Sequence, residues 1–217
     1  MKWSQKAWEA SLPLYEKILI HPFNRELMQG TLPKEKFEFY LQQDAFYLIE
    51  FGKVLVGTAM KMEDTDHAKA FLTFGSETIA EEQVLHDTYF KQFQTDSAPQ
   101  ASPTCLLYTS YMHTVLATKS LPEALGVVLP CFWIYKEVGD YIYQHQSKTA
   151  NPYQAWIDTY AGEGYGEAVQ LAIDICDEVA SACTPAQQEQ MIQTFLMSSK
   201  MEWMFWDSAY RLEDWPV

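Results

Sequence analysis

The stretch FEFYLQQDAFYLIEFGKVL, residues 37–55, decides the fold class of this chain. Its large apolar side chains recur every three or four residues, which is the spacing of one face of an α-helix. That face consists of Phe37, Tyr40, Leu41, Tyr47, Leu48, Phe51 and Leu55. The pattern predicts a long helix that buries this face against other elements.

The same helical period extends through the rest of the chain. Prolines and polar residues typical of helix starts separate the periodic runs. We expect helices over about residues 3–20, 31–62, 64–93, 104–118, 122–146, 162–182 and 184–210, a short helix from about 152, and a loop over 95–103. No run shows the two-residue alternation of a strand, and no flexible linker or repeat divides the chain. These features predict an all-α helical bundle that forms a single domain over residues 1–217.

Composition excludes several classes of partner. The chain has 217 residues, 48% of them hydrophobic, and a net charge of −14, with Arg25 and Arg211 as its arginines. Nucleic acids, polyphosphates and anionic membranes require clustered positive charge, so we expect none of them as partners. The longest apolar run, from Ala124 to Tyr135, is shorter than the roughly twenty residues that span a bilayer. The N-terminus also lacks the apolar core of a signal peptide, so we expect a cytoplasmic protein with reduced thiols.

The four cysteines are Cys105, Cys131, Cys176 and Cys183, and none forms a C-x-x-C pair. This spacing disfavours a zinc ribbon or a thioredoxin-like site. Cys176 and Cys183 are expected to share one helix face as small core residues.

Cys131 directly follows Pro130 in an otherwise apolar helical run. Because proline bends or restarts a helix, Cys131 could lie in a first helical turn, where the helix dipole favours a thiolate. The alternative is a buried structural cysteine beside a kink, and this segment alone favours that interpretation.

Asp44, Cys131 and Glu202 each interrupt the apolar face of a different predicted helix. Asp44 lies between Tyr40 and Tyr47 on the apolar face of its predicted helix. Glu202 lies three residues before Phe205, on the apolar face of the last predicted helix. A buried carboxylate is costly unless it is paired or hydrogen-bonded, so each acid alone could be a paired core residue. Three such groups on three helices instead favour a site inside the bundle.

A metal centre and a serine hydrolase site both lack support. Di-iron bundles use Glu-x-x-His pairs, whereas Glu82 and His86 are four residues apart and no second pair is present. We therefore expect no metal and no other cofactor. No G-x-S-x-G elbow is present, and the glycines of residues 162–166 follow no predicted strand, so they indicate a helix stop rather than a dinucleotide site.

An acid pair, a thiol and aromatic rings fit covalent chemistry on a flat heteroaromatic ring. Asp44 could accept from an exocyclic amino group, and a buried carboxyl such as that of Glu202 has a raised pKa and can donate a proton. The Cys131 thiolate could then add to an activated ring carbon. A substituted pyrimidine would suit these groups, although the chemistry alone does not select it.

Seven motifs resemble, in order along the chain, those of the TenA/thiaminase II family. They are His21-Pro22-Phe23, Gly30-Thr31-Leu32-Pro33, Gln43-Asp44-x-x-Tyr47-Leu48, Tyr108-Thr109-Ser110, Leu129-Pro130-Cys131-x-Trp133-x-Tyr135-x-Glu137-Val138-Gly139, Pro152-Tyr153-x-x-Trp156-Ile157-x-x-Tyr160 and Ser198-Ser199-x-x-Glu202-x-x-Phe205-Trp206. The resemblance implies a haem-oxygenase-like fold without haem and a homotetramer. It also implies hydrolysis of the aminomethyl pyrimidine from degraded thiamine to hydroxymethylpyrimidine and ammonia, and in some members cleavage of thiamine.

The resemblance also implies roles for matching residues. Cys131 falls at the position of the nucleophile, Glu202 at that of the proton donor and acceptor, and Asp44 at that of the residue that binds the pyrimidine amino edge. The pocket aromatics match Tyr47, Tyr108, Tyr135, Tyr160 and Phe205. Met201 stands where a tyrosine is common, the residues after Tyr160 do not align clearly, and Pro13 is expected to interrupt the first helix.

Two other functions stay open at this point. A non-catalytic pyrimidine- or thiamine-binding regulatory protein would keep the pocket, because one fold can host unrelated functions. A di-iron oxidase of the same shape is the third hypothesis, which metal analysis of the purified protein would test.

Overall fold

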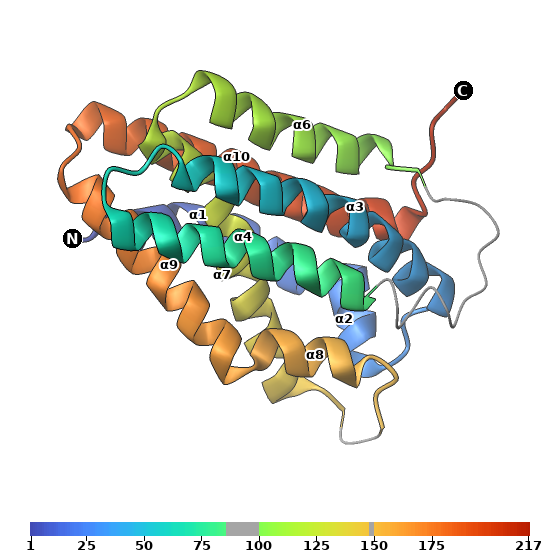
Figure 1. Ribbon diagram of the computed structural model, residues 1–217. Coiled ribbons are helices and arrows are strands. Elements are labelled where there is room, and N and C mark those ends of the chain that lie inside the picture. Colours follow the sequence, from blue (N-terminus) through green and yellow to red (C-terminus); the bar gives the residue numbers. More distant parts are fainter. Residues whose placement is uncertain (86–99, 148–149) are drawn as a thin grey trace.

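The computed structural model describes residues 1–85, 100–147 and 150–217, and within these ranges the protein is helical, with no strand (Figure 1). The helices are α1 (Trp3–Leu19), α2 (Pro22–Gln29), α3 (Lys34–Ala59), α4 (Thr65–Leu85), α6 (Pro103–Thr118), α7 (Leu121–His145), α8 (Gln154–Ala161), α9 (Glu163–Ser181) and α10 (Pro185–Arg211). The predicted all-α class is confirmed. None of the described helices is long and apolar enough to cross a membrane.

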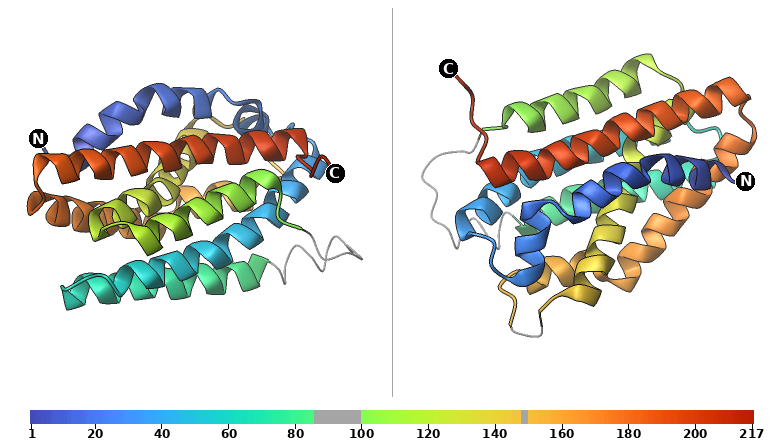
Figure 2. Two further views of the ribbon diagram at one scale, coloured as in Figure 1. Left: turned by 90° about the horizontal axis from the view of Figure 1, so that it is seen from above. Right: turned by 180° about the vertical axis from the view of Figure 1, so that it is seen from behind.

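Helix α7 occupies the centre of the bundle. It packs against α10, α8, α9, α6 and α3, and almost every residue from Glu123 to Tyr135 is buried. A helix that is apolar nearly all round is expected to be enclosed by others. Figure 2 shows the long helices α3, α6 and α10 running beside one another, with α4 outside α3 and α1 beside α10.

Close packing of α7 depends on its glycines. A Cβ atom built on Gly126 would lie 2.4 Å from the carbonyl oxygen of Met191 and from Oγ1 of Thr194, both on α10. A Cβ atom on Gly139 would lie 2.7 Å from Cβ of Tyr160 on α8. Glycine therefore lets α10 and α8 approach the backbone of α7.

Helix α2 was missed by the sequence prediction, which placed only the end of the first helix at His21-Pro22. The His21 ring accepts a hydrogen bond at Nδ1 from the backbone N–H of Phe23 at 3.2 Å, and Pro22 lies in the first turn. Gly30 then ends the helix at a φ of 71°, in the left-handed region that favours glycine. Pro22 thus starts a second helix, which is too short to show a clear period.

Proline does not divide the first helix or α7. Helix α7 continues through Pro130, so Cys131 lies in the interior of the helix, and the alternative that placed it in a first helical turn is wrong. Pro13 likewise lies inside α1. Packing on several sides of α7 holds the helix together across the missing N–H.

Smaller differences concern helix faces and ends. The helical spacing from Leu107 to Tyr111 predicts that Leu107 faces inward on α6, but this side chain is 48% exposed. Cys183 follows the end of α9 and therefore does not share a helix face with Cys176. Gly162 separates α8 from α9 as predicted, but α9 begins at the next residue. The predicted end of the 64–93 helix, most of the 95–103 loop and the Glu82/His86 side chains lie outside the described residues.

Candidate active site

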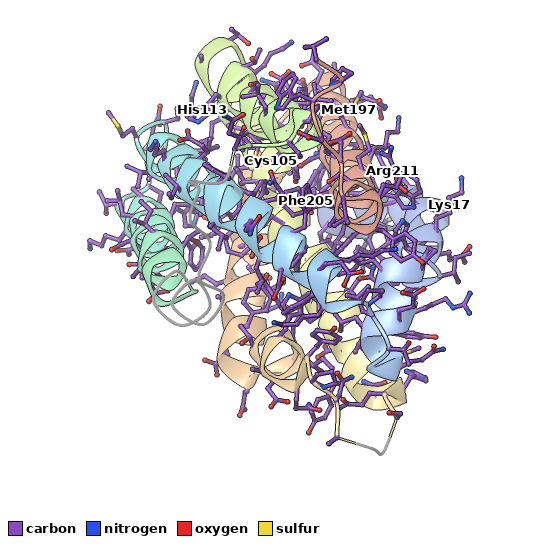
Figure 3. All side chains as sticks on the ribbon, turned by 90° about the vertical axis from the view of Figure 1, so that its right-hand side faces the viewer. Lys17, Cys105, His113, Met197, Phe205 and Arg211 are labelled. Atoms are coloured by element: carbon purple, nitrogen blue, oxygen red, sulfur yellow. The ribbon has the colours of Figure 1, made fainter. Side chains whose placement is uncertain are left out.

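The three reactive groups singled out from the sequence all lie in the interior, on three different helices. Asp44 on α3 is 3% exposed, Cys131 on α7 is 9% exposed and Glu202 on α10 is 1% exposed. The end-on view in Figure 3 shows Phe205, one turn after Glu202, at the centre of the molecule between α3 and α10. The helical period thus placed all three groups on the correct faces.

Glu202 is held by a tyrosine from the neighbouring helix. The hydroxyl of Tyr108 on α6 lies 2.5 Å from Oε1 of Glu202 and 2.7 Å from Oγ of Ser198. Burial raises the pKa of Glu202 to about 8, the charge of Asp44 raises it further, and the Tyr108 hydrogen bond acts in the opposite direction. A carboxyl group with this pKa is largely protonated at neutral pH and can serve as a general acid.

Tyr47, Tyr108 and Phe205 form an aromatic wall beside Glu202. The ring centroid of Tyr47 lies 4.9 Å from that of Tyr108 and 5.6 Å from that of Phe205. The Tyr47 hydroxyl also contacts the sulfur of Met112 at 3.7 Å. Such rings can hold a flat heteroaromatic molecule by stacking.

Tyr135 and Tyr160 form a second aromatic group around a residue that the site prediction did not include. Their ring centroids are 5.0 Å apart. Tyr40 donates to the Tyr135 hydroxyl at 3.4 Å and accepts from Nε1 of Trp156 at 3.3 Å. Tyr40 also packs edge-on to Phe205, with ring centroids 5.9 Å apart, and so joins the two aromatic groups. The sequence feature that could have identified Tyr40 as a site residue is its position one turn before Asp44 on the same apolar helix face.

Asp44 and Cys131 lie close enough to the tyrosines of this cluster for their charges to raise the pKa values of those tyrosines. After burial, the charge of Asp44 is the next largest cause that raises the pKa of Tyr40, and it also raises that of Tyr160. The charge of Cys131 raises the pKa of Tyr47 in the same way. The structure therefore brings all eight predicted site residues into one cluster, in which Tyr160 is only partly buried.

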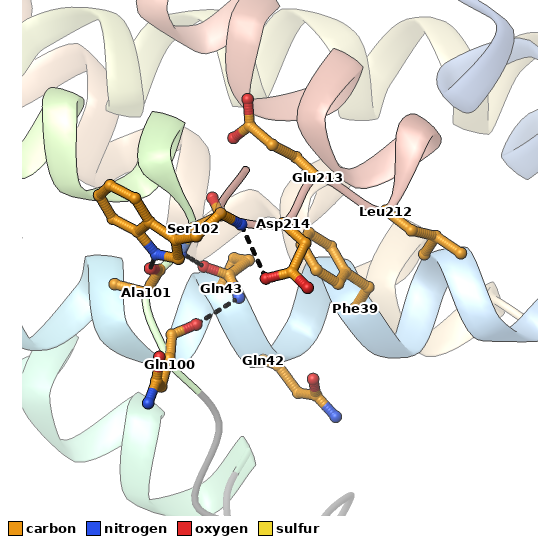
Figure 4. A pocket seen from close by; sticks show the side chains of 10 residues that line it. Phe39, Gln42, Gln43, Gln100, Ala101, Ser102, Leu212, Glu213 and Asp214 are labelled. Atoms are coloured by element: carbon orange, nitrogen blue, oxygen red, sulfur yellow. Dashed lines mark hydrogen bonds between the residues drawn. The ribbon is translucent and has the colours of Figure 1, made fainter. Parts of the chain in front are cut away.

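A separate pocket of about 520 Å³ lies at the surface between α3, the start of α6 and the C-terminal tail (Figure 4). Gln43 accepts there from the backbone N–H of Ser102 at 2.7 Å and donates to the carbonyl of Gln100 at 3.1 Å. The pocket contains none of the eight predicted residues. Across the described residues, no group of three or more His, Cys, Asp and Glu side chains could hold a metal ion.

Residues 8–212 match the sequence profile of the TENA/THI-4/PQQC family. The chain belongs to this family. It is 32% identical to the aminopyrimidine aminohydrolase of Bacillus subtilis (strain 168) over 99% of this chain and 92% of that protein.

Solved structures agree with the family fold. A TenA homologue from P. horikoshii OT3 superimposes with a TM-score of 0.85 and 26% identity, covering 97% of this chain and 99% of that one. A domain of unknown function with a haem-oxygenase-like fold from Shewanella denitrificans has a TM-score of 0.76 at 14% identity, covering 96% of this chain and 92% of that one. The predicted haem-oxygenase-like fold is thus confirmed.

Three polar residues of this TENA/THI-4/PQQC chain were not selected as site residues from the sequence. In the sequence pattern, Tyr40 and Trp156 look like ordinary core aromatic residues, and Ser198 looks like a small residue on a closely packed helix face. Ser198 is fully buried, and its hydroxyl donates to the carbonyl of Val127 at 2.7 Å. Their hydrogen bonds join distant parts of the chain, which helical spacing does not predict.

Proposed function

We propose that the protein is an aminopyrimidine aminohydrolase of thiamine salvage. It would convert the aminomethyl pyrimidine from degraded thiamine to hydroxymethylpyrimidine and release ammonia, and it could also accept thiamine. The buried Glu202 carboxyl, with a pKa raised to about 8 beside Asp44 and Tyr108, is the observation that carries this proposal, and Tyr108 also interacts with Cys131. The 32% identity to the Bacillus subtilis enzyme supports the same activity.

In the first step, the Asp44 carboxylate accepts a hydrogen bond from the pyrimidine amino group while aromatic rings hold the ring plane. The sulfur of Cys131 forms a bond to a ring carbon, and the electron pair displaced through the ring expels the amine from the methylene carbon. Glu202 supplies the proton that the departing amine takes away, which makes ammonia a competent leaving group.

In the second step, water adds to the methylene carbon and gives a proton to the Glu202 carboxylate. The Cys131 sulfur then leaves the ring with its bonding electrons, and the ring recovers its aromatic electrons. The balance is one water consumed and one ammonia released, and both Cys131 and Glu202 return to their starting states. Neither step requires a cofactor.

Product analysis with the two substrates side by side tests this proposal. We expect hydroxymethylpyrimidine and ammonia in equal amounts from the aminomethyl pyrimidine, and hydroxymethylpyrimidine with the free thiazole from any thiamine that is cleaved. Tight binding of both compounds without product would favour the non-catalytic binding protein instead. Stoichiometric iron in the purified protein would favour the oxidase.

The assembly and location are proposed on the family resemblance. We propose a homotetramer in the cytoplasm, with a small aminopyrimidine as the partner molecule. Sedimentation equilibrium of the purified protein tests the tetramer, and a monomer at micromolar concentration would contradict it.

A further inference from the structure

Ser198 connects the backbone of α7 to the acid on α10. It lies one helical turn before Glu202 and is fully buried. Its Oγ atom is 2.7 Å from the carbonyl oxygen of Val127 and 2.7 Å from the hydroxyl of Tyr108. Val127 precedes Cys131 by one turn of α7, so this chain of contacts runs from beside the thiol to the carboxyl of Glu202.

The number of available protons decides which group donates at each of these hydrogen-bond contacts. A backbone carbonyl can only accept, so the single hydroxyl proton of Ser198 goes to Val127. At the next contact Tyr108 must therefore donate to Ser198, which uses the single proton of the phenol. In the remaining contact, Tyr108 donates to Oε1 of Glu202 at 2.5 Å when the carboxylate is ionised. With the phenol proton on Ser198 instead, the proton of this contact must come from a protonated Glu202. All three contacts have a proton only when Glu202 is protonated.

We propose that Ser198 is a positioning residue that keeps the proton on Glu202 by accepting the hydroxyl hydrogen of Tyr108. The catalytic meaning of this proposal rests on the proposed function, whereas its geometry does not. When Glu202 is ionised, Tyr108 donates to the carboxylate, and one of the two contacts of Ser198, with Tyr108 or with Val127, is left without a proton. Ser198 thus opposes ionisation of Glu202 before the acid is needed.

The other titratable groups around Glu202 do not replace this effect. Those that interact with it are Asp44 and Tyr47 from α3, Tyr108 from α6 and Tyr135 from α7, while Cys131 from α7 interacts with Tyr47 and Tyr108. The charge of Asp44 also favours the protonated acid, whereas a Tyr108 free to donate would favour the carboxylate. Removing Ser198 leaves Asp44 in place and releases Tyr108.

Infrared titration of the substrate-free protein tests the proposal. The C=O band of the protonated Glu202 carboxyl is assigned by its loss in Glu202→Gln, and its intensity is followed with pH. We expect the midpoint of its loss to fall by about one pH unit or more in Ser198→Ala, because Tyr108 can then donate fully to the carboxylate. This measurement needs no turnover, so it remains informative if the proposed reaction is wrong.

Ser199→Ala is the matched control. Ser199 is also fully buried on α10. Its hydroxyl donates to the carbonyl of Phe195 within the same helix, outside the series of contacts from Val127 to Glu202. We expect no shift of the midpoint in Ser199→Ala, and none from Ser198→Ala in a Tyr108→Phe background. An unchanged midpoint in Ser198→Ala, an equal shift in Ser199→Ala, or a shift that persists without the phenol would overturn the proposal.

If Ser198→Ala does not fold, Ser198→Cys is the second variant, because it keeps the side-chain volume at this position. A thiol is a weak acceptor, so this variant is also expected to lower the midpoint. In the active enzyme, the limb of the kcat/KM profile that reports loss of the Glu202 proton should shift by the same amount, while Ser198→Thr, which restores a hydroxyl, should shift it less. A limb that stays at the wild-type pH in a folded Ser198→Cys protein would count against the proposal.

Discussion

The hydroxyl of Tyr108 lies 2.5 Å from Oε1 of Glu202, although the two residues are 94 positions apart in the chain. The contact joins α6 to α10 and places a phenol on a carboxyl that is 1% exposed. Burial outweighs this hydrogen bond, so the pKa of Glu202 is raised rather than lowered. In the proposed reaction, the protonation state of Glu202 therefore links folding stability to activity.

Stability should fall with pH because of Glu202. Its pKa is about 8 in the folded protein against an ordinary value of 4.5, so between these values the folded state binds more protons than the unfolded state. Its contribution to stability is complete below the ordinary pKa and is lost as pH rises through the folded pKa. At about 1.4 kcal/mol per pKa unit, we expect a loss of several kcal/mol.

Urea unfolding of the wild type and Glu202→Gln from pH 5 to pH 9 measures this loss. The amide does not ionise, so the variant should become more stable relative to the wild type as pH rises. A constant difference between the two proteins across this range would contradict the raised pKa.

Asp44→Asn should move the activity profile to lower pH. The charge of Asp44 raises the pKa of Glu202, so its removal lowers that pKa and Glu202 loses its proton earlier. We also expect KM for the aminomethyl pyrimidine to rise by about tenfold, because the amide cannot match a carboxylate as an acceptor. Asp174→Asn removes an exposed charge on α9 and should change neither quantity. If activity is lost at the same pH in Asp44→Asn as in the wild type, the predicted effect of Asp44 on the pKa of Glu202 is wrong.

Cys131→Ser should abolish turnover while the protein remains folded. A serine hydroxyl is a far weaker nucleophile than a thiolate, so kcat should fall by several orders of magnitude. Cys183→Ser is the control, since this half-buried thiol donates to the carbonyl of Val179, and a hydroxyl can do the same. Full activity in Cys131→Ser, measured as ammonia release, would remove the nucleophile assignment.

Gly126→Ala should loosen the contact between α7 and α10. The new methyl group would lie 2.4 Å from the backbone oxygen of Met191, which cannot move without shifting α10. We expect a loss of about 1–3 kcal/mol in stability, measured by urea unfolding, and a lower kcat. Gly164→Ala is the matched control, because its methyl group would meet no atom within 4 Å. Equal stability of the two variants would argue against tight packing at Gly126.

The local pattern predicted much of this protein. Helical spacing placed Asp44 and Glu202 on buried faces, and the structure confirms both positions. The pattern failed at prolines. Pro22 begins α2, and Pro13 lies inside α1 without interrupting it, because packing by neighbouring helices decides whether a helix continues through a proline.

The sequence by itself determined which side chains leave each helix toward the interior, because the period of a helix is a local property of the chain. It thereby identified Asp44, Cys131 and Glu202 as one candidate set. Only the tertiary structure decided their partners. The contacts of Tyr108 with Ser198 and Glu202, and of Ser198 with Val127, depend on how α6, α7 and α10 are aligned. That alignment results from close packing at sites such as Gly126, and it brings Tyr108 and Ser198 to Glu202.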